Sequence, residues 1–495
     1  MIVDVNRTTS LTIFTHLGQL LYDLSVSNDL ARTLHREIEL GNYLQTKRLD
    51  DVRALVTDLQ NVQDYIFTEY DQWSYCSNSE FVKKDVIPMW NFDKSQPVMT
   101  KSNLYDAVDK FILNWENLIS AVTKNETFIK YIKFIVMNSA DFSYEYSNIA
   151  MSGLVDCEVE RVNSFGTNIK ILLVAGLVLL ALFVSIIIGY IVMASKSYDN
   201  FWNFMFNNSQ VSLIQLKREA IDRLFAFHGI DYHSENIEND QRAHKHSKIK
   251  TDINKKYIWR LMIFFVIAAS YYLLTYFYLY VQCETSMMNR PKLLSNINLK
   301  RALLSRIGFF ARDTYSPYLI RIFPKLYEFS SSRKIFERSV ALYNEKDKEF
   351  RKKKYKKLMS KNLLRQIYET SDSSIPKLHY GARTGADFTI FEAYYISSQK
   401  SIESSYMPTF INLTREVQNE IGAQFLELDK NSKDVINSQL NDIILCTVSY
   451  SIALCILFFC YYLPYLNNES KQFTKLLILP TLLPMEEDKR MKPAG

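Results

Sequence analysis

Glycine and proline are scarce in this sequence, whose 495 residues include only 12 Gly and 11 Pro. Such low counts exclude collagen-like and Gly/Pro-rich proteins, and a hydrophobic content of 48% excludes a wholly disordered chain. A large excess of one charge is also missing, since 59 Lys and Arg nearly balance 53 Asp and Glu. Nucleic-acid-binding proteins usually carry a strongly basic surface, so no nucleic-acid partner is expected.

Motifs for phosphate binding, nucleophilic catalysis and metal binding are absent as well. No Gly-x-x-x-x-Gly-Lys-Ser/Thr, Gly-x-Gly-x-x-Gly, Gly-x-Ser-x-Gly or His-Glu-x-x-His pattern occurs. Histidines 228, 233, 244 and 246 match no metal-site spacing and lie in a polar stretch typical of a solvated linker. The sequence therefore predicts a non-enzymatic protein with no catalytic residue, no cofactor and no metal site.

Charged residues are also absent from three long apolar runs, residues 171–194, 261–281 and 443–466. At a rise of about 1.5 Å per residue, each run is long enough as a helix to cross a hydrocarbon core of roughly 30 Å. Trp259 and the tyrosines of the second and third runs are typical of membrane interfaces. The sequence thus predicts a multi-pass protein of the plasma membrane or an endomembrane, with three transmembrane helices in the lipid bilayer.

Three spans would place residues 1–170 and 282–442 on one side of the membrane, and residues 195–260 and 467–495 on the other. The second side has more Lys and Arg near the span ends, which predicts that it is cytosolic. The first side carries glycosylation sequons at Asn6, Asn125 and Asn412, against Asn207 and Asn468 on the second. Both large segments are therefore expected to be exoplasmic, as parts of a glycoprotein.

The first 21 residues lack the basic start and continuous apolar core of a signal peptide. Export of residues 1–170 ahead of a first span would then be unusual. Either this segment is cytosolic or the chain is the tail of a longer protein with an upstream span. We expect the second.

Apolar residues in both large segments recur every three or four positions, the spacing of one helix face. The three clearest such seams are Val52, Leu55, Leu59, Val62 and Ile66; Leu104, Val108, Phe111, Trp115, Leu118 and Val122; and Phe410, Leu413, Val417, Ile421, Phe425 and Leu428. Residues 27–30 resemble a helix start, and Gly41 and residues 151–153 resemble helix breaks. The predicted fold is all-α, with each large segment a separate bundle of three or four long helices.

No strong breaker separates the last seam from the third span, and residues 157–170 lead similarly into the first. Helices continuous with spans can relay a shift across the bilayer, although continuity can also serve only to anchor a bundle. The predicted function is a receptor-like membrane sensor or a scaffold in signalling. The alternative is a subunit of an oligomeric ion channel or transport complex, favoured by a polar face of the second span that consists of Ser270, Tyr271, Thr275 and Tyr278.

The segment 195–260 begins with residues 197–230, in which apolar and charged residues alternate. This pattern predicts an amphipathic helix that lies on the membrane or binds a cytosolic protein partner. Lysines nearer the second span are expected to contact anionic lipid headgroups. They are Lys248, Lys250, Lys255 and Lys256.

Small residues recur every four positions in the first span, at Ala181, Ser185 and Gly189. Such a face lets two helices approach closely, either within the chain or in a homo-oligomer. We leave both alternatives open.

Three of the six cysteines, at positions 76, 157 and 283, share the side predicted to be exoplasmic. Cys283 lies directly beyond its span, whereas Cys157 stands about 20 Å from its own span if the intervening residues are helical. A disulfide between Cys76 and Cys157 is therefore predicted, and three free thiols in a cytosolic domain are the alternative.

The order of these segments carries a family resemblance. A helical segment and a span precede FWNFMFNNSQVSLIQLKREAIDRLFAFHGID at 201–231, and a second span, a second helical segment and a last span precede KLLILPTLLP at 475–484. This order resembles the carboxyl-terminal membrane region of the tiny macrocysts family of large protist membrane proteins, over residues 170–495. The resemblance implies a membrane sensor or scaffold. It brings no catalytic residue, and the further spans, PAS domain and TPR-like region of the family are not found here.

Overall fold

The structure is a computed structural model, and it divides the chain into two compact units. It describes residues 2–40, 46–68, 84–92, 97–124, 126–208, 252–282, 288–324, 329–369, 378–403 and 405–456, together with residues 459, 460, 464, 467 and 471. Unit 1 comprises Met1–Thr167 and Tyr280–Leu440, and unit 2 comprises Asn168–Leu279 and Asn441–Gly495. Unit 1 is therefore assembled from two distant parts of the chain.

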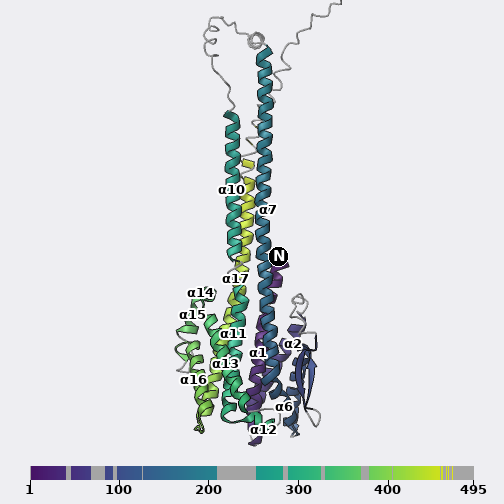
Figure 1. The fold of residues 1–495 in the computed structure, drawn as a ribbon, viewed down its shortest axis with the longest axis vertical. Coiled ribbons are helices and arrows are strands. Elements are labelled where there is room, and N and C mark those ends of the chain that lie inside the picture. The colour runs from purple at the N-terminus through teal and green to yellow at the C-terminus, as the bar shows by residue number, and fades with distance from the viewer. Residues whose placement is uncertain are drawn as a thin grey trace, which may run out of the picture. The chain divides into compact units, whose positions relative to one another are not determined.

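Unit 1 is mostly helical (Figure 1). Its first part contains α1 (Ile2–Glu39), α2 (Thr46–Thr68), α5 (Leu104–Lys124), α6 (Ile129–Met137) and the beginning of α7 (Ser143–Asn208). Its second part contains α11 (Asn289–Tyr315), α12 (Tyr318–Ile322), α13 (Phe329–Phe350), α14 (Lys353–Lys356), α15 (Lys361–Tyr368), α16 (Ala382–Ser398) and the beginning of α17 (Tyr406–Ile456).

The three predicted seams lie on α2, α5 and α17, and every one of their apolar side chains is buried. Burial of one stripe on each helix is the expected result of a spacing of three and four residues. Trp115 of α5, for example, has no exposed surface. The helical prediction for these segments is confirmed.

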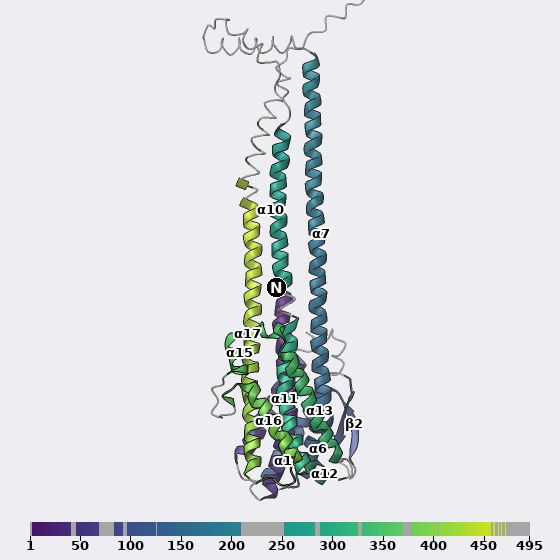
Figure 2. The same ribbon diagram turned by 60° about the vertical axis from the view of Figure 1, so that its left-hand side comes forward.

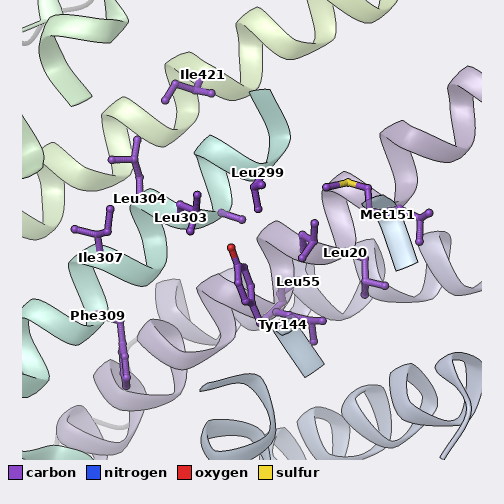
Figure 3. Close-up of a cluster of buried hydrophobic side chains, with 14 of the residues drawn as sticks. Leu20, Leu55, Tyr144, Met151, Leu299, Leu303, Leu304, Ile307, Phe309 and Ile421 are labelled. Carbon is purple, nitrogen blue, oxygen red and sulfur yellow. The ribbon is translucent and has the colours of Figure 1, made fainter. Parts of the chain in front are cut away.

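Helix α11 forms the centre of unit 1, where nearly all of its 27 residues are buried. It packs on α1 from the first part of the chain and on α13 and α16 from the second. Figure 3 shows this core, in which Leu20 and Met151 come from the first part and Leu303, Leu304 and Ile421 from the second. The two segments thus share one hydrophobic core, which corrects the prediction of two separate bundles.

Two predicted helix boundaries are wrong, because residues that favour helix ends lie inside longer helices. Side-chain hydrogen bonds stabilise them in one case and tertiary packing in the other. Helix α1 runs through residues 27–30: Ser27 Oγ donates to the Asp23 carbonyl oxygen at 2.8 Å, and the Asn28 side chain is hydrogen-bonded to Ser139. Helix α7 likewise runs through residues 151–153, where Met151 and Gly153 are buried. Tertiary packing outweighs the low helix propensity of glycine there. Gly41 lies outside the described residues.

The described residues are mostly helical, in agreement with the predicted all-α class, and one short β-hairpin accompanies the helices. Strands β1 (Ile87–Asn91) and β2 (Val98–Ser102) pair antiparallel, with Ile87 opposite Ser102. The hairpin is attached to the π-helix η2 (Asn138–Phe142), because the Asn138 side chain accepts from the Trp90 backbone N–H at 2.7 Å and donates to its carbonyl oxygen at 2.9 Å. Within the described residues these are the only strands.

Unit 2 contains the remainder of α7 and α17 and most of α10 (Asp252–Gln282), which lie side by side within it (Figure 1 and Figure 2). Within the described residues only Val174–Met193 is both long and apolar enough to cross a membrane. The prediction of three spans is therefore supported for the first run alone.

The other two runs are described over shorter lengths than the first. In the second, the apolar stretch within the described residues is the shorter Met262–Thr275. In the third, α17 is described only as far as Ile456.

Candidate functional site

A pocket of about 60 Å³ lies between α1, α11 and α17 in unit 1. On each helix the lining residues are three or four positions apart, so each helix turns one face to the pocket. These faces include Asp29 and Thr33 of α1, Ser305 and Arg312 of α11, and Thr414, Arg415 and Gln418 of α17. Arg48 at the start of α2 completes the lining.

Small residues keep this space open between closely packed helices. Gly308 of α11 lies so near α17 that a methyl group on its Cα would meet Thr414 Cγ2 at 3.1 Å. Such a distance is shorter than ordinary van der Waals contact, so a larger residue at position 308 would push on Thr414. A change at position 308 of α11 is therefore passed to α17 through Thr414.

The pocket lining contains three arginines and one carboxylate. Arg312 forms an ion pair with Asp29, and burial lowers the pKa of its guanidinium to about 10, which leaves it charged at neutral pH. Arg48 forms ion pairs with Glu37 at 3.2 Å and Asp51 at 3.3 Å. Among the described residues, Arg415 has neither a carboxylate nor a hydrogen-bond partner, so its charge is not compensated by an ion pair.

Two buried polar side chains beside Arg415 also lack hydrogen-bond partners within the described residues. Ser305 and Gln418 both line the pocket and are each 5% exposed. The Ser305 hydroxyl and the Gln418 amide are not among the fully buried atoms that lack a partner, so both keep accessible surface. They are therefore available to a polar occupant of the pocket.

The Arg415 guanidinium lies close enough to Tyr22 to act on the pKa of the tyrosine. The tyrosine lines the pocket and stacks under Arg301, whose Cζ lies 3.5 Å from the ring centroid. Burial raises the pKa of Tyr22, while the charges of Arg301 and Arg415 act in the opposite direction. Arg301 also donates to the Gln418 carbonyl oxygen at 3.2 Å, which connects the α11 and α17 faces next to the pocket.

Comparison with family models, curated proteins and solved structures finds no match to this chain. The resemblance to the tiny macrocysts family therefore stays a prediction.

A second polar cluster in unit 1 is held together by ion pairs around one buried carboxylate. Buried Asp347 of α13 accepts from Lys300 of α11 at 2.7 Å and also faces Arg351 at 3.1 Å and Arg383 at 3.4 Å. The Lys300 ammonium lies between the rings of Phe350 and Tyr343. Within the described residues no cluster of His, Cys, Asp or Glu could hold a metal ion.

The small-residue face predicted on the first span does not pack inside the part of the chain that the structure describes. Ala181 and Ser185 are exposed, and a methyl group at Gly189 would meet nothing within 4 Å. The close approach occurs instead at Gly176, against which Tyr272 of α10 packs. Gly176 lies five residues before Ala181 and so does not fit the spacing of four, which is why the sequence pattern did not single it out.

Cys157 is disulfide-bonded, as the sequence predicted, but Cys76 lies outside the described residues and the pairing stays a prediction. Of the three sequons, Asn412 is exposed on α17, Asn6 lies in α1 and Asn125 is outside the described residues. The remaining predicted contacts, to lipid headgroups, lie outside the described residues (Lys248 and Lys250) or in α10 with side chains that are not described (Lys255 and Lys256).

Proposed function

We propose that the protein is a multi-pass membrane sensor, in which unit 1 binds a ligand outside the cytosol and α17 relays its state into the membrane. One observation carries the proposal. Thr414, Arg415 and Gln418 of α17 line the pocket, and the same uninterrupted helix continues to Ile456 in the third apolar run. A ligand that moves these residues moves the helix to which they belong.

Unit 1 itself supports a second crossing of the membrane. Residues before Thr167 and after Tyr280 share one core, so they must lie on the same side of any bilayer. If Val174–Met193 crosses, the chain has to return before Tyr280, and residues 261–281 are the apolar run available for this return.

Exposed apolar side chains in unit 2 also favour a lipid environment. Phe183, Phe277 and Leu445, on α7, α10 and α17 respectively, are all more than half exposed. Contiguous apolar surface of this kind is rare on water-soluble proteins, but it is what a helix presents to lipid tails. All three apolar runs therefore serve as spans in the proposed arrangement.

The disulfide at Cys157 supports an exoplasmic or lumenal unit 1. Disulfides persist in oxidising compartments and are rare in the cytosol. Cys455 and Cys460, in unit 2, are free.

The channel alternative receives less support from the polar face of α10. Tyr271 stacks on Tyr450 with ring centroids 4.2 Å apart, and the Tyr278 hydroxyl donates to Asp442 at 3.2 Å. These side chains are engaged in packing between α10 and α17. A face engaged in this way is not free to line a pore.

Two labelling experiments on the full chain test the topology. In a chain whose Cys283, Cys446, Cys455 and Cys460 are changed to Ala, a membrane-impermeant maleimide applied to intact cells should label Asn412→Cys and should reach Lys471→Cys only after permeabilisation. Both residues are exposed, so access to the thiol reports the side of the membrane. Labelling of Asn412→Cys from the cytosolic side would reverse the proposed orientation.

The relay is tested in bilayer discs with an environment-sensitive fluorophore on Lys471→Cys, after Cys283, Cys446, Cys455 and Cys460 are changed to Ala. Gly308→Ala should shift the emission, because the added methyl group pushes Thr414 of α17. Asn441→Pro should abolish this shift by interrupting the helix, whereas Asn441→Ala should preserve it. An unchanged spectrum in Gly308→Ala would refute the relay.

A further inference from the structure

We infer that the pocket between α1, α11 and α17 binds a small oxyanion of about four non-hydrogen atoms, of the size and charge of a short carboxylate, with Arg415 as its principal contact. The inference rests on the proposed sensor function for the role of the ligand, and on the pocket alone for binding. Size, charge and unpaired donors each support it.

The size of the pocket limits the ligand. A cavity needs roughly 15 Å³ of this kind of space to hold one water molecule, and the pocket has about 60 Å³. A ligand of about four non-hydrogen atoms therefore fills it.

The charge of the pocket selects an anion. The carboxylate in the lining, Asp29, is already paired with Arg312, and Arg48 is paired with Glu37 and Asp51. Arg415 is left with an uncompensated positive charge at a half-buried position. A cation would be repelled, and a neutral ligand would leave this charge unpaired.

The hydrogen-bonding groups of the pocket select an oxyanion over a simple halide. The Arg415 guanidinium presents two parallel N–H donors, a geometry that matches two oxygens on one carbon or phosphorus atom. The Ser305 hydroxyl and the Gln418 amide lie in the same lining and have donors to spare. Two or three acceptor oxygens would satisfy all of these groups together.

The position of Arg415 and Gln418 explains how such a ligand could act on the relay helix. Both residues belong to α17, while Ser305 belongs to α11, so one anion would connect the two helices. Binding would hold the α17 face against α11. Loss of the anion would release a helix that continues into unit 2.

The test uses the full chain in bilayer discs, with thermal unfolding followed at constant ionic strength while sodium chloride is exchanged for sodium acetate or sodium phosphate. Acetate should raise the midpoint in a saturable manner. Phosphate tests the inorganic source of the same chemistry, and acetamide, which has the shape of acetate without its charge, should have no effect. Isothermal titration with the same three compounds supplies the affinities.

The variants locate the site. Arg415→Gln should weaken acetate binding by about tenfold or more, as expected for a lost hydrogen bond between charged groups, and Ser305→Ala by about threefold to tenfold. Arg338→Gln is the matched control, because this arginine is 80% exposed and pairs with Glu145 on the surface. Its affinity should equal that of the natural sequence. If Arg415→Gln unfolds, Arg415→Lys keeps the charge and should retain part of the affinity.

Several outcomes would overturn the inference. These are the absence of saturable binding by either anion, equal binding of acetate and acetamide, and an affinity unaffected by both Arg415→Gln and Ser305→Ala. If acetate binds through Arg415 but leaves the fluorophore on Lys471→Cys unchanged, the relay fails and the binding site stands. If the fluorophore responds to Gly308→Ala but no anion binds, the relay stands and the binding site is refuted.

Discussion

The buried ion pair between Lys300 and Asp347 should respond asymmetrically to removal of its two members. The carboxylate faces three cations, whereas the Lys300 ammonium has Asp347 as its one carboxylate within ion-pair distance among the described residues. Both side chains of the pair are buried, 7% and 5% exposed. Removing the carboxylate therefore leaves a buried charge without compensation, but removing the lysine does not.

The number of charged partners that each residue has sets the expected loss in the free energy of unfolding. Asp347→Asn should lower the free energy of unfolding by about 3–5 kcal/mol, the usual cost of an uncompensated buried charge. Lys300→Met keeps an apolar chain between Tyr343 and Phe350 and leaves Asp347 paired with two arginines, so its cost should be only about 1 kcal/mol. The double variant should resemble Lys300→Met, with a coupling of roughly 3–5 kcal/mol.

The assay is denaturant or thermal unfolding of the full chain at pH 7, followed by tryptophan fluorescence. Trp115 is completely buried in unit 1, so its emission reports on this core. Burial alone would raise the pKa of Asp347, but Lys300, Arg383 and Arg351 outweigh it and lower the pKa. The contribution of the carboxylate is therefore present above its ordinary pKa and is lost as the pH falls through the lowered value. Equal losses in the two single variants, or additive losses in the double variant, would refute the reasoning.

Further predictions concern other close contacts and buried groups. Gly18→Ala should destabilise unit 1 by about 1–3 kcal/mol in the same unfolding assay, because Asn298 of α11 occupies the space of the new methyl group and is itself buried. Asp23→Asn should raise the unfolding midpoint at pH 7 and lose this advantage near pH 4. Burial and the nearby Asp58 raise the pKa of the Asp23 carboxyl, so that its ionisation penalises the folded state as the pH rises. Gly189→Ile should weaken self-association in a membrane association assay without changing unfolding, whereas Gly176→Ile should displace Tyr272 and lower the unfolding midpoint. Equal effects of these two glycine substitutions would contradict the assignment of their faces.

The helices with one apolar stripe could be predicted from the sequence, and the central helix could not. On α5 the buried residues from Leu104 to Val122 follow the regular spacing of a half-exposed helix. Helix α11 is buried on all sides and yet carries Arg290, Lys300 and Arg306, so it has neither a stripe nor an apolar run. These polar groups bond to partners from distant parts of the chain, such as the Ala140 carbonyl oxygen for Arg306. The sequence alone cannot show partners that are more than 100 residues away.

The pocket was missed for a related reason. Arg415 lies beside the α17 seam and could not be distinguished from a solvated surface charge. Ser305 and Gln418 are of residue types common at any surface. These residues stand out only because three helices bring them together, without hydrogen-bond partners, in one pocket. That arrangement depends on the packing of α1 against α11, which are separated by about 280 residues.

Because α11 completes a core begun by α1, biosynthesis of the protein has a fixed order of events. The ribosome releases residues 1–167 and both apolar runs up to residue 281 before the central helix of unit 1 exists. During that interval the face of α1 that packs on α11 has no partner, which favours capture by chaperones of the compartment that receives it. The same arrangement means that two polypeptides, 1–208 and 252–495, would each hold half of a core, so co-expression should restore unit 1 where neither half folds alone.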